Sequence, residues 1–191
     1  MASIDSASGD YPVRYAVDYA EGRDRVSVLF RILLIIPAFV LASGLSVVGA
    51  PVALMLLFRH KYPGWWFEWN RELSRFNARL GAYALLLRDE YPSTDEEQSV
   101  HLAIDAPVAA QLNRWLPLVK WLLAVPHYLI LAVLWLAVLV TTAIAWLAIM
   151  ITGKYPRGLF DFAVGVAQWT NRVMGYAFLL VTDRYPPFSL K

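Results

Sequence analysis

One sequence pattern occurs twice in the chain, and this internal repetition constrains the fold more than any other feature. Four segments of the first half, 13–18, 31–37, 61–68 and 79–87, return as 100–105, 120–126, 154–161 and 172–180. The separation grows from 87 residues, between Val13 and Val100, to 94 residues, between Asp89 and Asp183, so a few residues were inserted within one copy. The sequence therefore predicts a tandem duplication of one unit.

Two long apolar runs predict that this unit is embedded in a membrane. Residues 32–58 contain no ionisable side chain, and residues 121–151 contain only His127. Each run exceeds the roughly 20 residues that cross the hydrocarbon as a helix. The chain is 59 % hydrophobic and 17 % charged, below the roughly 25 % charged residues of soluble domains. We therefore expect an all-α integral membrane protein.

Each predicted crossing helix begins at a proline near the start of its run. Pro37 and Pro126 should kink the chain, and 38–58 and 127–151 then match one bilayer crossing each. The preceding 30–36 and 115–125 would be entry turns near the headgroups. An alternative interpretation divides each run into a hairpin near Ser43-Gly44 and near Leu134-Trp135.

A second helix follows each Lys-Tyr-Pro, over 65–87 and 159–181. The first of these is amphipathic, with five charges on one side, so it either lies along the interface or turns its charged side to a protein interior. The alternation in 13–19 and 100–105 predicts short strands outside the bilayer. We favour a two-helix repeat, because both strand segments then lie on one side, where they can pair.

These patterns divide the chain into four parts. They are a disordered N-terminal tail at 1–10, membrane repeat one at 11–92, an acidic linker at 93–99 and membrane repeat two at 100–191. The tail lacks the basic region of a signal peptide, so the first apolar run should remain in the mature protein.

The duplicated polar positions are the candidate functional residues. Glu68 and Asp161 either handle protons or cations inside the bundle or occupy a helix's first turn, where the helix dipole favours them; the second interpretation is favoured. Arg79 and Arg172 suit a lipid phosphate or pair with neighbouring carboxylates. A polar path between the repeats would be lined by Glu68, Arg75, Arg79, Asp161, Gln168 and Arg172.

His127 is a possible proton relay within the second run. No second His and no Cys lies close to it in sequence, so we expect no metal site. Interfacial anchors are predicted at Lys61, Tyr62, Lys154 and Tyr155, where lysine snorkels and tyrosine sits among headgroups.

The second half resembles a bacterial, largely actinobacterial, membrane protein family catalogued as domain of unknown function forty-three eighty-nine. The resemblance rests on 118–128, on 153–162 and on 182–188, and it is close over 112–190 and weaker over 11–92. It implies a location in the bacterial inner membrane, which we expect the chain to cross several times. The resemblance brings no catalytic residues.

No catalytic motif or phosphate-binding glycine loop occurs, and a net charge of +2 gives no reason to expect nucleic acid. We therefore expect a non-enzymatic protein without a cofactor, an accessory or scaffold subunit of a larger membrane complex or homo-oligomer. Its partners would be membrane lipids and a membrane protein or a second copy. A small transporter or channel, or a lipid-binding protein, are the alternatives.

Overall fold

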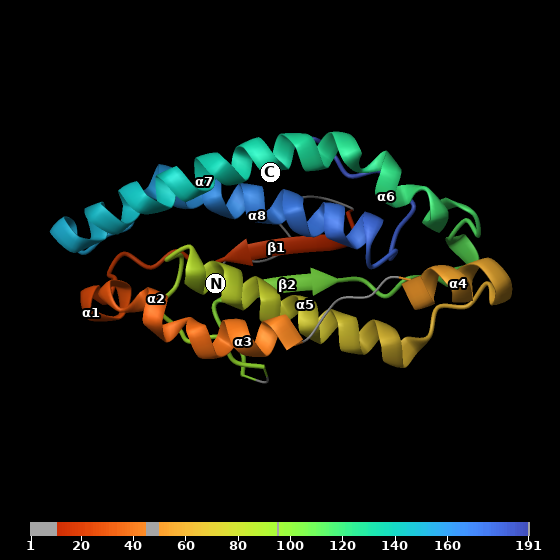
Figure 1. Cartoon of the computed structure of the whole chain (residues 1–191), viewed down its shortest axis with the longest axis horizontal. Helices are drawn as coiled ribbons and strands as arrows, with labels where there is room; N and C mark the ends of the chain where they lie inside the picture. The colour runs from red at the N-terminus through yellow and green to blue at the C-terminus, as the bar shows by residue number, and fades with distance from the viewer. Residues whose placement is uncertain (1–10, 45–49, 95, 191) are drawn as a thin grey trace.

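A two-stranded antiparallel sheet lies at the centre of a mostly helical structure (Figure 1). The computed structural model describes residues 11–44, 50–94 and 96–190, so the tail expected over 1–10 lies outside the described residues. Strand β1 (Val13–Val17) pairs with β2 (Val100–Ile104), and Tyr15 lies opposite Leu102. Buried and half-buried residues alternate along both strands. The predicted strand segments and their pairing are confirmed.

Two helices of equal length cover the inner side of this sheet. Helix α5 (Gly64–Ala84) packs on β2, and α8 (Arg157–Ala177) packs on β1. The contact at α8 is close, because a Cβ added at Gly175 would lie 2.6 Å from Val13 Cγ2. The sheet, α5 and α8 thus form the inner layers of the molecule (Figure 1).

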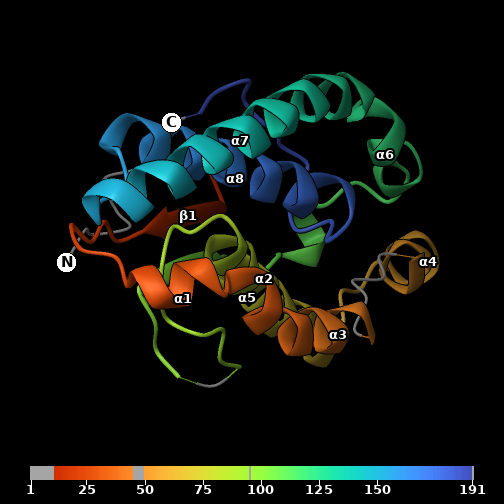
Figure 2. The same cartoon turned by 60° about the vertical axis from the view of Figure 1, so that its left-hand side comes forward.

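An outer layer of apolar helices covers α5 and α8. It contains α1 (Arg25–Leu29), α2 (Arg31–Leu34), α3 (Ile36–Gly44), α4 (Ala50–Arg59), α6 (Lys120–Leu123) and α7 (Val125–Thr152). The single turns η2 (Ala109–Gln111) and η3 (Leu116–Leu118) connect β2 to α6. Helices α7 and α8 lie side by side along the long axis (Figures 1 and 2).

The two predicted kinks at proline are breaks between helices. Pro37 and Pro126 each stand second in a new helix, α3 and α7, after the short helices α2 and α6. A proline is tolerated in the first turn because its missing N–H has no intrahelical acceptor there. The structure therefore has a break between two helices where a kink in one helix was predicted. Short helices do precede each proline, and their place near the headgroups stays a prediction.

The first apolar run does not form the predicted single crossing helix. It is divided between α3, with 9 residues, and α4, with 10 residues, which point in different directions (Figure 2). At 1.5 Å per residue, each is about 15 Å long, half the thickness of the hydrocarbon. The alternative break near Ser43-Gly44 matches the end of α3, but the one near Leu134-Trp135 is wrong, because α7 is continuous there.

Helix α7 is the one helix among the described residues that is long and apolar enough to cross a membrane. A core helix of a soluble protein passes the same test, but such a helix is mostly buried. Only 17 % of the most apolar stretch of α7 is buried. Every exposed side chain from Val125 to Ile151 is apolar.

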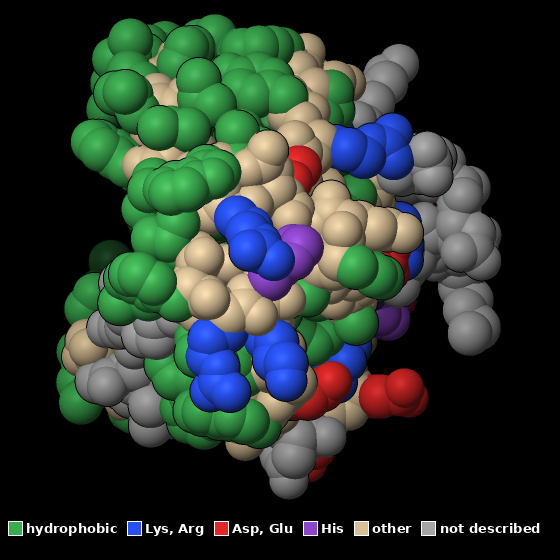
Figure 3. Space-filling model, turned by 90° about the vertical axis from the view of Figure 1, so that its right-hand side faces the viewer, with side chains coloured by type: hydrophobic (Ala, Val, Ile, Leu, Met, Phe, Trp, Pro, Cys, Tyr) green, Lys and Arg blue, Asp and Glu red, His purple; other side chains and the backbone are tan. Residues whose placement is uncertain are grey.

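Exposed apolar side chains gather on one side of the molecule, which we call the apolar face. It is formed by the outer sides of α1–α4, η3, α6 and α7, and includes Ile32, Phe39, Phe58, Val133, Leu136 and Ile151. Viewed along the long axis from the end that holds α4 and α6, hydrophobic side chains cover the left side and the top, whereas basic side chains begin at the edge of this area and the acidic ones lie further from it (Figure 3). The opposite side, the polar face, carries the ion pairs Arg14–Asp105 and His101–Asp18 on the outer side of the sheet.

Candidate functional site

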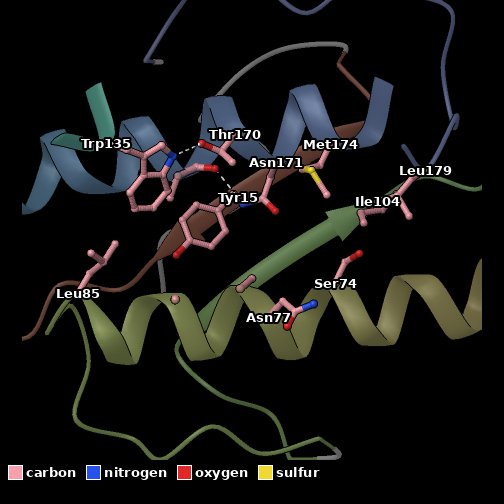
Figure 4. Close-up of a pocket in the computed structure, with 13 residues that line it drawn as sticks. Tyr15, Ser74, Asn77, Leu85, Ile104, Trp135, Thr170, Asn171, Met174 and Leu179 are labelled. Carbon is pink, nitrogen blue, oxygen red and sulfur yellow. Dashed lines mark hydrogen bonds between the residues drawn. The ribbon is translucent and has the colours of Figure 1, made fainter. Parts of the chain in front are cut away.

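A cavity of about 270 Å³ lies between α5 and α8 at the centre of the molecule (Figure 4). Helix α5 contributes Ser74, Asn77 and Gly81, α8 contributes Thr170, Asn171 and Met174, and α7 contributes Trp135. Tyr15 and Ile104 of the sheet form its base, and Ala78, Ala167, Leu85 and Leu179 complete the lining. None of these lining residues carries a charged side chain.

Polar groups in the cavity differ in how far the protein satisfies them. Trp135 Nε1 donates to Thr170 Oγ1 at 3.1 Å, and that hydroxyl donates to a carbonyl of its own helix at 2.8 Å (Figure 4). Tyr15 is 3 % exposed as a whole residue and lines the cavity, and its hydroxyl is not among the fully enclosed polar atoms without a partner in the part of the chain that the structure describes. Asn77 also lines the cavity, but its side chain is exposed, so its amide is accessible to solvent. Burial raises the pKa of Tyr15, so its hydroxyl stays protonated and can donate.

The cavity lies on the helical side of the sheet. The sheet closes its base, α5 and α8 form its walls, and Trp135 places α7 beside it. A second, wider groove of about 600 Å³ separates α1 and α2 from α7. Leu85 lines the cavity and its neighbours Ala84 and Leu86 line the groove, so the two spaces lie close to each other at the end of α5.

A buried ion pair joins the start of α6 to the end of α8. Lys120 is fully buried, and its Nζ lies 2.7 Å from an oxygen of Asp183 and donates to Thr182 O at 2.8 Å. The ammonium also lies 5.2 Å from the ring centre of Tyr176. Burial lowers the pKa of Lys120, and the hydrogen bond and charge of Asp183 oppose this. The second Asp183 oxygen accepts the N–H of Asn113 at 2.6 Å.

The first half contains a matching ion pair at the start of α2. Arg31, 4 % exposed, pairs with Asp89 and donates to Arg88 O at 3.0 Å, and its guanidinium lies 3.9 Å from the ring centre of Tyr83. The second Asp89 oxygen accepts the N–H of Asp24 at 3.1 Å. Sequence reasoning did not select either cation, although both begin segments that repeat. That repetition was the available signal.

Most residues proposed for a polar path lie away from the central cavity. Glu68 pairs with the half-buried Arg71, and Asp161 pairs with Arg157 at 3.3 Å; both carboxylates lie on exposed helix surface. Arg75 and Arg79 line a separate depression beside β2, where they donate to Leu102 O and Ser93 O.

The two remaining candidates of the path, Gln168 and Arg172, are buried in α8. Arg172 donates to Ser189 O at 3.4 Å and lies 6.0 Å from the ring centre of Tyr11. Burial lowers the pKa of Arg172, and Tyr11 opposes this. The six candidates therefore do not line one shared space.

His127 lies in an aromatic cluster near the start of α7. It is fully buried, accepts the Trp169 Nε1 hydrogen at 3.0 Å and stacks on Phe188 at 4.0 Å between ring centres. Its Nε2 has no hydrogen-bond partner among the described residues. The structure thus surrounds His127 with rings, and the described residues contain no group of His, Asp or Glu with metal-binding geometry.

The predicted interfacial anchors are of two kinds. Lys61 and Lys154 are exposed at opposite ends of the molecule, beside the starts of α5 and α8 (Figure 1). Tyr62 is half-buried and donates to Leu179 O at 2.6 Å. Tyr155 is fully buried, so the prediction of a headgroup anchor is wrong there: its ring packs edge-on against Phe160.

Fold and site together define a mostly helical protein with a one-sided apolar surface and an uncharged cavity. Residues 115–189 match the model of the family described as Domain of unknown function (DUF4389), so the chain has a DUF4389 domain there. That domain includes η3, α6, α7 and α8. No curated protein and no solved structure matches the chain.

Proposed function

We propose that the chain is a non-enzymatic lipid-handling protein of the bacterial inner membrane, embedded through its apolar face. The position of the central cavity carries this proposal: the sheet forms its base, so we infer that it opens on the opposite side, toward the face whose exposed side chains are apolar. A ligand that enters the cavity from this side comes from the bilayer. Helices α1–α4, α6 and α7 would contact acyl chains, and the polar face would contact water.

The distribution of charge favours a molecule that lies along the membrane surface. The ion pairs Arg14–Asp105 and His101–Asp18 lie on the central sheet, midway along the molecule (Figure 1). If α7 spanned the bilayer with the long axis along the normal, these groups would lie at hydrocarbon depth. Each ionised side chain there costs about 2.5–3.5 kcal/mol. With the apolar face down, as in an interfacial protein, every one of these groups meets water.

A second function follows if the chain instead crosses the bilayer. The multi-pass arrangement expected from the sequence would leave the polar face at hydrocarbon depth, and a partner protein would have to cover it. The chain would then be an accessory or scaffold subunit, and the charges of the polar face are the observation that favours this role. A transporter receives less support, because the candidate path residues do not share a cavity.

Cysteine labelling distinguishes the two arrangements, because the chain contains no cysteine. Lys61→Cys and Lys154→Cys place single thiols at opposite ends of the molecule. We expect a membrane-impermeant maleimide to label both from the same side of the membrane, with Glu97→Cys on the polar face as a positive control. Labelling from opposite sides would refute the surface arrangement and favour the spanning subunit.

We further propose that the two halves arose by duplication of one unit. The two buried ion pairs and their aspartate contacts support this. So do the residues with positive φ among those described: His60 and Gly153 precede the two Lys-Tyr-Pro motifs, and Leu86 and Leu180 follow α5 and α8. Leu86 and Leu180 each stand three residues before the paired aspartates, Asp89 and Asp183, and because such backbone is unfavourable for leucine, its recurrence there supports a common origin.

A further inference from the structure

We propose that the central cavity binds the head of an uncharged lipid that presents carbonyl oxygens as hydrogen-bond acceptors. This inference rests on the proposed lipid-handling function and names its ligand class. Acylglycerols and isoprenoid quinones share this chemistry. Their apolar chains would leave through the opening toward the apolar face and follow the groove between α1 and α7.

The uncharged lining selects against ionic heads. A phosphate or carboxylate buried without a cation loses its hydration and gains no compensating charge. The cavity lining contains no Lys, Arg or His, and the buried cations Lys120 and Arg31 are already paired with aspartates. Anionic phospholipid heads therefore lack a counter-charge in the cavity, and a neutral head loses less on entry.

Two polar groups of the lining supply the recognition. The Tyr15 hydroxyl lies at the base of the cavity and is protonated, and the exposed Asn77 amide lies on the wall that α5 forms. The Tyr15 hydroxyl borders the cavity and can donate to a carbonyl oxygen that reaches it, which adds one hydrogen bond to the binding of the head. Asn77 can donate to a second oxygen of the same head. The protein donates both of these hydrogen bonds, so an acylglycerol or a quinone needs only carbonyl oxygens as acceptors.

The size of the cavity fits a head rather than a whole lipid. Its volume of about 270 Å³ lies at the lower limit of ligand pockets, roughly 300–1,000 Å³. Gly81 keeps part of this space open, because a Cβ added there would meet no atom within 4 Å. A larger side chain at Gly81 should fill the cavity without a clash in the protein.

The test measures binding of two probes to the full chain in nanodiscs of a zwitterionic phospholipid. The probes are a short-chain diacylglycerol and a short-chain naphthoquinone with an isoprenoid tail, with phosphatidylglycerol of equal chain length as the anionic comparison. We expect at least one neutral probe to bind, Tyr15→Phe to weaken it about 3- to 10-fold, the value of one hydrogen bond, and Gly81→Leu to abolish binding. Tyr128→Phe is the matched control, because its buried hydroxyl lacks a partner among the described residues and lies outside the cavity.

The outcomes separate the ligand class from the general function. Preference between the two neutral probes identifies the source of the carbonyl and supports the proposal in either case. The neutral-lipid site is overturned if Tyr15→Phe binds the neutral probes as tightly as the unaltered chain does, or if only phosphatidylglycerol binds. The more general proposal of lipid handling is then still tested by Gly81→Leu. If Gly81→Leu folds, as judged by circular dichroism, and retains as much native lipid as the unaltered chain, the cavity does not handle lipid and both proposals fail.

Discussion

Removing the charge of Asp183 should destabilise the fold much more than removing its partner, Lys120. Asp183→Asn leaves a fully buried ammonium without its counter-ion, whereas Lys120→Met leaves a carboxylate that is 23 % exposed and still accepts the Asn113 N–H. A broken buried pair costs about 3–5 kcal/mol. The lysine can avoid this by losing its proton, which at pH 7 costs about 5 kcal/mol from an ordinary pKa of 10.5. We therefore expect Asp183→Asn to cost about 3–5 kcal/mol at pH 7, and Lys120→Met about 1–2 kcal/mol.

The stability of Asp183→Asn should depend on pH, and the direction of the change follows from the pKa of Lys120. In Asp183→Asn the pKa of Lys120 is depressed further in the folded state, so the unfolded chain binds more protons and stability rises with pH. The deficit should shrink as the pH approaches 10.5. The control is Asp89→Asn, whose partner Arg31 cannot lose its proton, so its deficit should persist over the same range.

Unfolding in mixed micelles, followed by circular dichroism, measures both series. The double variant Lys120→Met with Asp183→Asn should be close to Lys120→Met alone, because no buried charge is left. A cost below about 1 kcal/mol for Asp183→Asn, where a broken buried pair should cost about 3–5, would refute the assignment of Lys120 as a buried cation. So would a cost that does not change with pH.

Three further predictions concern the loop after α5 and two glycines. Burial favours the neutral form of Glu90, but hydrogen bonds from Ser99 and Arg88 outweigh this effect and lower the pKa of Glu90 from 4.5 to about 2. The contribution of the ionised carboxylate to stability is therefore complete above pH 4.5 and is lost as the pH falls toward 2. The stability of Glu90→Gln, measured over the same acid range, should lack this pH-dependent part. A Cβ at Gly165 would lie 2.7 Å from Leu190 O, so Gly165→Ala should release the C-terminal segment and speed its digestion by carboxypeptidase, while Gly158→Ala, with open space around it, should not. Gly153 has φ of +74°, and Gly153→Ala should lower the free energy of unfolding by about 1–2 kcal/mol, whereas an unchanged value would show that the backbone there relaxes.

Local sequence patterns predicted the helices and strands of this fold better than the points at which an apolar run divides into separate helices. The strands and α5 and α8 follow from short-range alternation and from the Lys-Tyr-Pro motifs, which recur in sequence. The division of the first apolar run was harder to predict, because a hydrophobic run of this length satisfies a crossing helix as well as two shorter ones. Pro51, which stands second in α4, was the local signal that a new helix begins.

The candidate site could not be predicted from the sequence, for a different reason. Asn77, Thr170 and Tyr15 form no motif, and they share a cavity only because α5 and α8 pack side by side on the sheet. Sequence reasoning instead selected charged residues, which on α5 face outward and pair with neighbours one turn away, as Glu72 and Arg75 do at 2.8 Å. A site lined by uncharged side chains gives no such signal.

The register of the small sheet bears on the origin of the chain. Val13 faces Ile104, Tyr15 faces Leu102 and Val17 faces Val100, and in the repeated pattern Leu102 is the counterpart of Tyr15 itself. This pairing is therefore the one that two copies of a half-length chain would make about a two-fold axis, each strand adding to the same strand of its twin. A gene fusion that joined such a homodimer would have inherited its interface complete, and the later divergence of one half would have needed no new contact surface.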